Sequence, residues 1–164
     1  MKNIILTANG FNNNGKRSDA IESLFERIAK DKSVLLIGNA SKNTNINSRK
    51  DVKDNFYNIG AKQVDLIDIG AESLEKILDY DVIYVIGGDV GELIELNNST
   101  EFKDYIMKFL EKGIYIGESA GSIIMGNDCK WVYDIKKGSK PKYDKIYPLF
   151  LGGKTYGKVR FKRD

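Results

Sequence analysis

The chain has 164 residues, a length suited to one domain with a sizeable core, and its 41% hydrophobic and 30% charged residues are typical of a soluble globular protein. The net charge of +3 is too small to indicate nucleic-acid binding, and no apolar stretch approaches the roughly 20 residues of a membrane-spanning helix. With one cysteine, Cys129, and no histidine, the sequence excludes an internal disulfide and a Ser-His-Asp triad, shows no metal-ligand cluster, and favours a cytoplasmic protein without cofactors.

Apolar segments of strand length alternate with segments of helical periodicity from the N-terminus to residue 125. The expected strands are Ile4–Thr7, Val34–Ile37, Val64–Ile69, Val82–Ile86 and Ile114–Ile116. The expected helices are Arg17–Lys30, Ser48–Ile59, Ala71–Leu78, Gly91–Leu96 and Thr100–Lys112. We expect the first strand to be buried, and the third, in which apolar and acidic residues alternate, to lie near a sheet edge. The alternation of strand and helix predicts an α/β fold of three layers with a mostly parallel central sheet.

The segment of residues 114–125, IYIGESAGSIIM, carries the strongest functional signal. It holds Gly-x-Ser-x-Gly between an expected strand and an apolar helical segment, which is the setting of a nucleophile elbow. In such a turn the hydroxyl of Ser119 projects from strained backbone, and small neighbours let strand and helix approach closely. The amide of Ala120, unpaired at the start of the helix, could face a developing oxyanion. The alternative is a glycine-rich turn with an incidental serine.

A second glycine motif, Gly87 and Gly88, follows the expected strand Val82–Ile86. In open α/β sheets ligands bind beyond the carboxyl ends of the strands, where both motifs fall. The amide of Gly88 is the candidate second oxyanion donor, because glycine lets the backbone come close to a reacting carbonyl. The alternative is a tight strand-to-helix turn. A phosphate-binding loop is a further alternative, but no nucleotide-binding glycine pattern surrounds these residues.

The sequence IGESAGS at 116–122, with YVIGGDV at 84–90, resembles the aspartyl dipeptidase (dipeptidase E) family of serine peptidases, whose relatives include cyanophycinases. The resemblance extends from the N-terminus to about residue 134 and implies a flavodoxin-like or class I glutamine amidotransferase-like fold. It also implies that Ser119 hydrolyses short peptides with an N-terminal aspartate, with the amides of Gly88 and Ala120 holding the oxyanion. Asp89 and Val90 stand where the family has asparagine and threonine, so the substrate contacts at this loop remain open.

The resemblance is incomplete at the acid and the base of the family's catalytic triad. Asp134 follows the serine at the spacing of the family's triad acid, with Asp128 as its competitor and a solvated loop carboxylate as the alternative for both. The family's histidine is absent, and Leu149 stands where it is expected. Glu118 adjoins the serine, but the neighbours of a nucleophile in such a turn point away from its side chain. Sequence alone selects no lysine as a base, so we expect impaired hydrolysis.

Residues 1–150 are expected to form one α/β peptidase-like domain and residues 151–164 a basic tail unlike the family, which suggests a truncated or frame-shifted product or a degenerate paralogue. Three functions stay open: an impaired serine peptidase, a non-catalytic protein that binds a peptide or another small ligand, and a nucleotide-binding flavodoxin-like module. The expected partner is a short peptide, not nucleic acid or membrane. A homodimer could cover a sheet edge that the short C-terminus leaves exposed.

Overall fold

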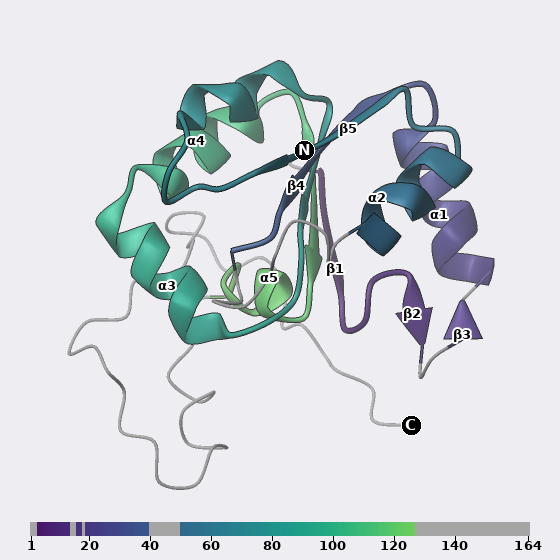
Figure 1. Ribbon diagram of the computed structural model, residues 1–164, viewed down its shortest axis with the longest axis horizontal. Coiled ribbons are helices and arrows are strands. Elements are labelled where there is room, and N and C mark those ends of the chain that lie inside the picture. The colour runs from purple at the N-terminus through teal and green to yellow at the C-terminus, as the bar shows by residue number, and fades with distance from the viewer. Residues whose placement is uncertain (1–2, 14–15, 18, 40–49, 127–164) are drawn as a thin grey trace, which may run out of the picture.

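The computed structural model describes residues 3–13, 16–17, 19–39 and 50–126 (Figure 1). Several sequence predictions therefore lie outside the described residues. These are the triad acid Asp134, its competitor Asp128, Cys129, Leu149 and the basic tail of residues 151–164, together with the domain boundary expected at residue 150.

A five-stranded sheet forms the centre of the fold, and all four of its strand pairings are parallel (Figure 1). Its order is β1-β7-β6-β4-β5, so the first and last strands of the described sheet lie side by side. The strands are β1 (Asn3–Thr7), β4 (Ser33–Ile37), β5 (Gln63–Ile67), β6 (Val82–Val85) and β7 (Ile114–Glu118). Because all five run in the same direction, the segments that follow them gather at one edge of the sheet.

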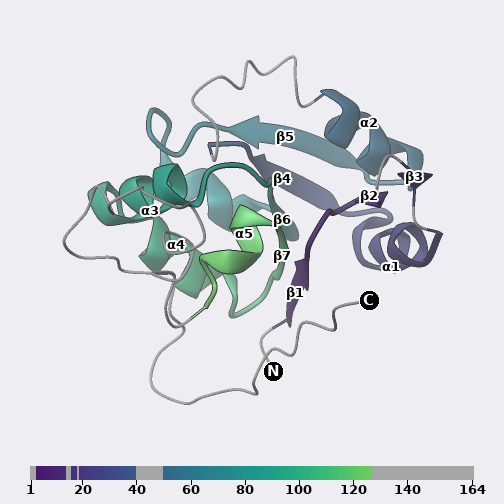
Figure 2. The same cartoon turned by 90° about the horizontal axis from the view of Figure 1, so that it is seen from below.

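Helices cover both faces of this sheet and give three layers (Figure 2). Helices α1 (Asp19–Ala29) and α2 (Lys50–Asn58) lie on one face. The other face carries η2, a 3-10 helix at Leu74–Asp79, with α3 (Val90–Ser99), α4 (Phe102–Phe109) and α5 (Ala120–Ile123). A short antiparallel hairpin, β2 (Asn12–Asn13) and β3 (Lys16–Arg17), follows β1. The expected three-layer α/β fold is therefore confirmed, with a fully parallel main sheet.

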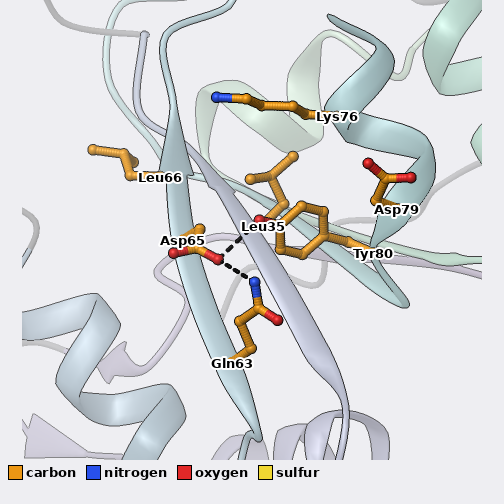
Figure 3. Close-up of a pocket in the computed structure, with 7 residues that line it drawn as sticks. All are labelled: Leu35, Gln63, Asp65, Leu66, Lys76, Asp79 and Tyr80. Atoms are coloured by element: carbon orange, nitrogen blue, oxygen red, sulfur yellow. Dashed lines mark hydrogen bonds between the residues drawn. The ribbon is translucent and has the colours of Figure 1, made fainter.

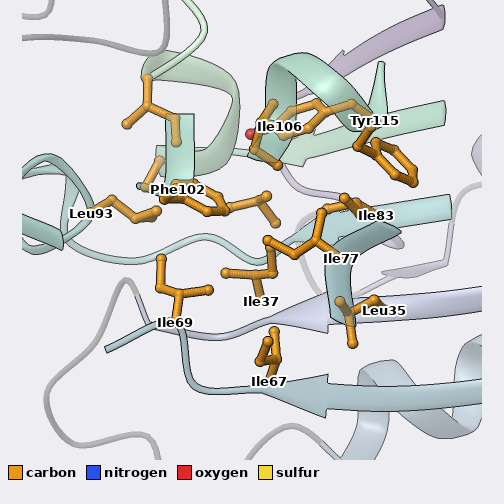
Figure 4. Packing of buried hydrophobic residues seen from close by; sticks show 14 of the residues in the cluster. Leu35, Ile37, Ile67, Ile69, Ile77, Ile83, Leu93, Phe102, Ile106 and Tyr115 are labelled. Carbon is orange, nitrogen blue, oxygen red and sulfur yellow. The ribbon is translucent and has the colours of Figure 1, made fainter. Parts of the chain in front are cut away.

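Two apolar cores lie on opposite faces of the sheet, because alternate residues of each strand point to opposite sides. Strands β4 and β6 supply both, and all four residues of β6 are buried. The core under α3, α4 and α5 is mostly aliphatic (Figure 4). The core under α1 and α2 centres on four aromatic rings whose centroids lie 4.9–6.2 Å apart. These rings belong to Phe11, Phe25, Phe56 and Tyr84.

Two local predictions differ from the structure. The first strand is not buried: its residues are half-buried or exposed, and Leu6 keeps 38% of its surface. The reason is its place at the edge of the described sheet, where β7 is its only partner. The helix expected at Ala71–Leu78 begins only at Leu74 and has 3-10 geometry. The third strand does lie at an edge, as its alternating pattern predicts.

Candidate active site at the turn after β7

Ser119 occupies a strained turn between β7 and α5. Its backbone has φ 48° and ψ −106°, a conformation that residues with a side chain rarely adopt, and its side chain is exposed. Such strain costs about 1–3 kcal/mol and persists only where the surroundings enforce it. Here the Ser119 amide donates to the Thr7 carbonyl oxygen at 2.9 Å, while the Ser119 carbonyl accepts from the amides of Ser122 and Ile123. The turn therefore has the geometry of a nucleophile elbow.

The two glycines of the motif permit this turn because each meets backbone at close range. A Cβ on Gly117 would lie 2.6 Å from the Gly121 carbonyl oxygen, and one on Gly121 would lie 2.4 Å from the Val85 carbonyl oxygen. The buried hydroxyl of Tyr115 donates to that Gly121 carbonyl at 2.7 Å, and burial raises the pKa of this phenol. Helix α5 is thus fixed against β6 and β7. Because Ser119 directly precedes α5, this packing also fixes the position of Ser119.

A network of hydroxyls beneath the turn joins the end of β1 to the end of β7. The Ser122 hydroxyl accepts from the Thr7 amide at 3.0 Å, and its one proton can go to the carbonyl of Thr7 at 2.8 Å or of Gly117 at 2.7 Å. The Thr7 hydroxyl lies 3.1 Å from the same Gly117 carbonyl and accepts from the Gly10 amide at 3.1 Å. Sequence reasoning included Ser122 in the motif that resembles the family but assigned it no role.

The second glycine motif lies against the elbow, because β6 and β7 are neighbours in the sheet. A Cβ on Gly87 would lie 3.0 Å from the Ser119 Cβ, and Gly88 has φ 157°, a value that favours glycine. Ala120 is the first residue of α5, so its amide has no acceptor within the helix. Asp89 is the N-cap of α3, and its carboxylate accepts from the Gly91 amide at 2.7 Å and the Glu92 amide at 3.4 Å.

Glu118 is the charged group placed next to this turn. Its side chain points to the face of the sheet that carries α1 and α2, where the buried Tyr84 hydroxyl donates to Glu118 Oε2 at 2.6 Å. The other carboxylate oxygen lies on the Gly87 side, 3.3 Å from the position that a Cβ on that glycine would take. Sequence reasoning directed this side chain away from the serine without locating the carboxylate. The structure brings the Glu118 carboxylate to Gly87, the glycine that also lies beside Ser119.

A separate cavity of about 380 Å³ lies against β4 and the outer strand β5 (Figure 3). Asp65 in its wall accepts from Gln63 at 2.6 Å and from the Tyr80 hydroxyl at 2.8 Å. The hydrogen bond from Gln63 is the main cause that lowers the pKa of Asp65, and burial, followed by Asp65, raises the pKa of Tyr80 to about 12. None of the residues that line this cavity belongs to the elbow or to the Gly87 loop, so the cavity is not part of the candidate active site.

The described residues contain neither a cluster suited to a metal ion nor a membrane-spanning helix. No cluster of three or more His, Cys, Asp or Glu residues with the geometry of a metal site occurs among them. None of the helices in this part of the chain combines the length and apolar character that a membrane span requires.

Residues 4–144 match Peptidase family S51, which is most of the chain. The chain belongs to peptidase family S51. The family match includes Gly88, Ser119, Ala120 and Asp134, and it ends before the basic tail of residues 151–164. The predicted relationship to the aspartyl dipeptidases is therefore confirmed at the level of the family and the fold.

Solved structures of similar proteins agree with this assignment to family S51. A crystal structure described as a peptidase E protein from Listeria monocytogenes EGD-e has a TM-score of 0.72 and 26% sequence identity, and the match covers 93% of this chain and 76% of that one. A peptidase from an acI-B1 Actinobacterium has a TM-score of 0.58 at 19% identity, covering 74% of this chain and 55% of that one, and supports the fold alone. No curated protein matches the chain.

Proposed function

We propose that this family S51 protein is a serine-type peptidase-like hydrolase that acts slowly on short peptides with an N-terminal aspartate. The observation that carries the proposal is the strained, exposed turn of Ser119, so close to Gly87 that a Cβ on that glycine would lie 3.0 Å from the Ser119 Cβ. Its relatedness to a peptidase E protein supports the substrate class. The single cysteine, Cys129, supports a cytoplasmic location, where thiols stay reduced.

In this proposal Ser119 Oγ attacks the carbonyl carbon of the first peptide bond, its proton leaves to a base, and the carbonyl oxygen becomes an oxyanion. The amides of Gly88 and Ala120 are the donors to that oxyanion. Asp134 takes the part of the triad acid. The amine of the second residue leaves with a proton, and water then releases the aspartate from the serine ester.

The absence of a histidine base accounts for the slow rate. The 164 residues contain no histidine, and the Ser119 hydroxyl makes no capping hydrogen bond at the start of α5. Enzymes that lose one triad member retain only about 10³–10⁴-fold acceleration over water, which comes from substrate binding and the oxyanion donors. We therefore expect turnover far below that of a serine peptidase with a complete triad.

Labelling with a serine-reactive fluorophosphonate, read by intact mass, tests the nucleophile. We expect one adduct, which disappears in Ser119→Ala and persists in Ser99→Ala, a matched change at an exposed serine of α3. An adduct that survives in Ser119→Ala would assign the reactive hydroxyl elsewhere. No adduct on the wild-type chain would reject an activated Ser119.

A non-catalytic peptide-binding protein is the second candidate function. The missing histidine favours it, and so does Asp89, which stands where the family has asparagine and caps α3. Calorimetry with short acidic peptides tests this alternative. A protein that binds them at micromolar to millimolar concentration without releasing aspartate would support it, and the absence of heat at millimolar peptide would reject it.

A homodimer is part of the proposal because β1 is an edge strand of the described sheet and its residues are half-buried or exposed. Such edges offer unpaired backbone groups to a second strand. Size-exclusion chromatography with light scattering should give twice the monomer mass, and a monomer at high protein concentration would contradict the dimer.

A further inference from the structure

The carboxylate of Glu118 lies between the two loops that flank the elbow. A Cβ on Gly10, in the loop after β1, would lie 2.8 Å from Glu118 Oε2, and one on Gly87, in the loop after β6, would lie 3.3 Å from Glu118 Oε1. The same point on Gly87 is 3.0 Å from the Ser119 Cβ. The absence of side chains at both glycines therefore lets the carboxylate lie beside the candidate nucleophile.

Tyr84 holds the Glu118 carboxylate in one orientation. The phenol is fully buried among the aromatic rings of the α1 and α2 face, and its hydroxyl donates to Glu118 Oε2 at 2.6 Å. A Cβ on Gly10 would lie 1.9 Å from that hydroxyl, so only glycine fits above the pair. With Oε2 bound in this way, Oε1 is the oxygen left on the side of Gly87 and Ser119.

Glu118 has no cationic partner within the described part of the chain. The ion pairs found there, Lys30 with Glu26 and Lys76 with Glu72, lie elsewhere on the surface. Glu118 itself is only half-buried, so it can meet a ligand. An ionised carboxylate accepts hydrogen bonds through both oxygens and donates none, so its natural complement is a cation with N–H donors.

We propose that Glu118 binds the free α-ammonium group of the peptide's N-terminal residue. This inference rests on the proposed peptidase function of Ser119. In a peptide cleaved after its first residue, a single carbon atom separates the α-nitrogen from the scissile carbonyl carbon. The ammonium group must therefore lie immediately beside the attacking oxygen, which is where the structure holds an anchored carboxylate. A blocked or internal peptide bond offers no charge there, so Glu118 selects free N-termini and makes the site that of an exopeptidase.

Calorimetry on Ser119→Ala, which cannot turn substrate over, tests this subsite with the dipeptide Asp-Leu and its N-acetylated form. In the Ser119→Ala background, adding Glu118→Gln keeps the shape of the side chain and an acceptor for Tyr84 but removes the charge. We expect the dissociation constant for Asp-Leu to rise about tenfold to hundredfold, the range of a lost charge-assisted hydrogen bond. Affinity for the acetylated dipeptide, which is weak in both proteins, should not change.

Glu111→Gln in the same background is the matched control. Glu111 is exposed just after α4, at the end of the sheet opposite to the elbow, so its removal changes the net charge equally without touching the site. Equal binding of Asp-Leu with and without Glu118→Gln would overturn the proposal, and so would a loss of the same size in Glu111→Gln. If Glu118→Gln does not fold, the comparison of the two ligands on Ser119→Ala tests the subsite. The proposal requires this protein to bind Asp-Leu more tightly than the acetylated dipeptide, and equal affinities would overturn it.

The proposed ammonium subsite and the proposed serine nucleophile are tested by different experiments. Absence of Asp-Leu binding to Ser119→Ala at millimolar concentration would reject the ammonium subsite, while fluorophosphonate labelling of the wild-type chain reports on Ser119 without any ammonium group. Labelling of Ser119 with no preference for free amines would leave a serine nucleophile and refute only the role of Glu118. Preference for free amines without labelling would establish the subsite in a non-catalytic protein.

Discussion

Replacing Gly121 by alanine tests whether the close approach of α5 to β6 sets the position of Ser119. The added Cβ would lie 2.4 Å from the carbonyl oxygen of Val85 and 2.8 Å from its Cβ, both below the 3.0 Å that real Cβ contacts respect. Val85 belongs to a buried central strand that cannot swing aside as the end of a flexible side chain can. The helix must therefore move away from β6 and take the turn with it.

The cost follows from the atoms that the new methyl group meets. Overpacking a close-packed interior costs typically about 1–3 kcal/mol, and obstruction by backbone belongs at the upper end of that range. For a domain of this size each kcal/mol lowers the melting temperature by about 2–4 °C. We therefore expect Gly121→Ala to melt about 6–12 °C below the wild-type protein, and its labelling by fluorophosphonate to slow because Ser119 is displaced.

Thermal unfolding followed by circular dichroism measures this effect, with Gly70→Ala as the matched control. Gly70 is exposed, and a Cβ there would meet only side-chain atoms, Leu96 Cδ2 at 3.1 Å and Asp68 Oδ1 at 3.3 Å. We expect this control to stay within about 0.5 kcal/mol of the wild type. If Gly121→Ala melts within about 2 °C of Gly70→Ala, the close approach of α5 to β6 does not set the position of the turn.

Two further predictions concern groups outside the turn itself. Asp89→Ala should lower the free energy of unfolding by about 1 kcal/mol because α3 loses its N-cap, whereas Asp89→Asn should stay close to wild type; equal losses in urea unfolding would contradict the capping role. Asp81→Asn should cost less than about 1 kcal/mol at pH 7, since this exposed carboxylate accepts from the Ser33 amide, the main cause that lowers its pKa. A lowered folded-state pKa stabilises the protein above the unfolded value of about 3.9 and ceases to do so as the pH falls through the folded value, so the difference should vanish in acid; a difference that persists at pH 2 would contradict this reasoning.

Sequence reasoning located the elbow because the motif itself carries the requirement for small residues, and the structure places strain at Ser119 as that motif demands. It also found the strands and most helices, since their periodicity is local. It misjudged β1, whose apolar residues read as a buried strand, because the order of strands in a sheet depends on pairings that no short segment encodes.

The contacts around Glu118 and Asp89 could not be predicted either, because they depend on how distant segments or the local backbone are arranged in space. Alternation along β7 could assign Glu118 to a face, but its partner Tyr84 lies 34 positions earlier in the chain. Asp89 was considered only for its effect on substrate contacts, because a carboxylate in a loop gives no sign that it caps the following helix until the backbone conformation is known.

The neighbours of β1 also dictate when the site can assemble as the protein is synthesised. In the described sheet β1 pairs only with β7, and the hydroxyl of Ser122 joins that pair through Thr7 across 115 positions. In a growing chain β1 therefore has no strand of this sheet to pair with until β7 has been synthesised, whereas β4, β5 and β6 can already associate. Closing so long a loop is a late and slow step in folding. Partly made or partly refolded chains can thus hold much of the helical structure and the central strands, while the serine turn acquires its strained shape only when β1 pairs with β7.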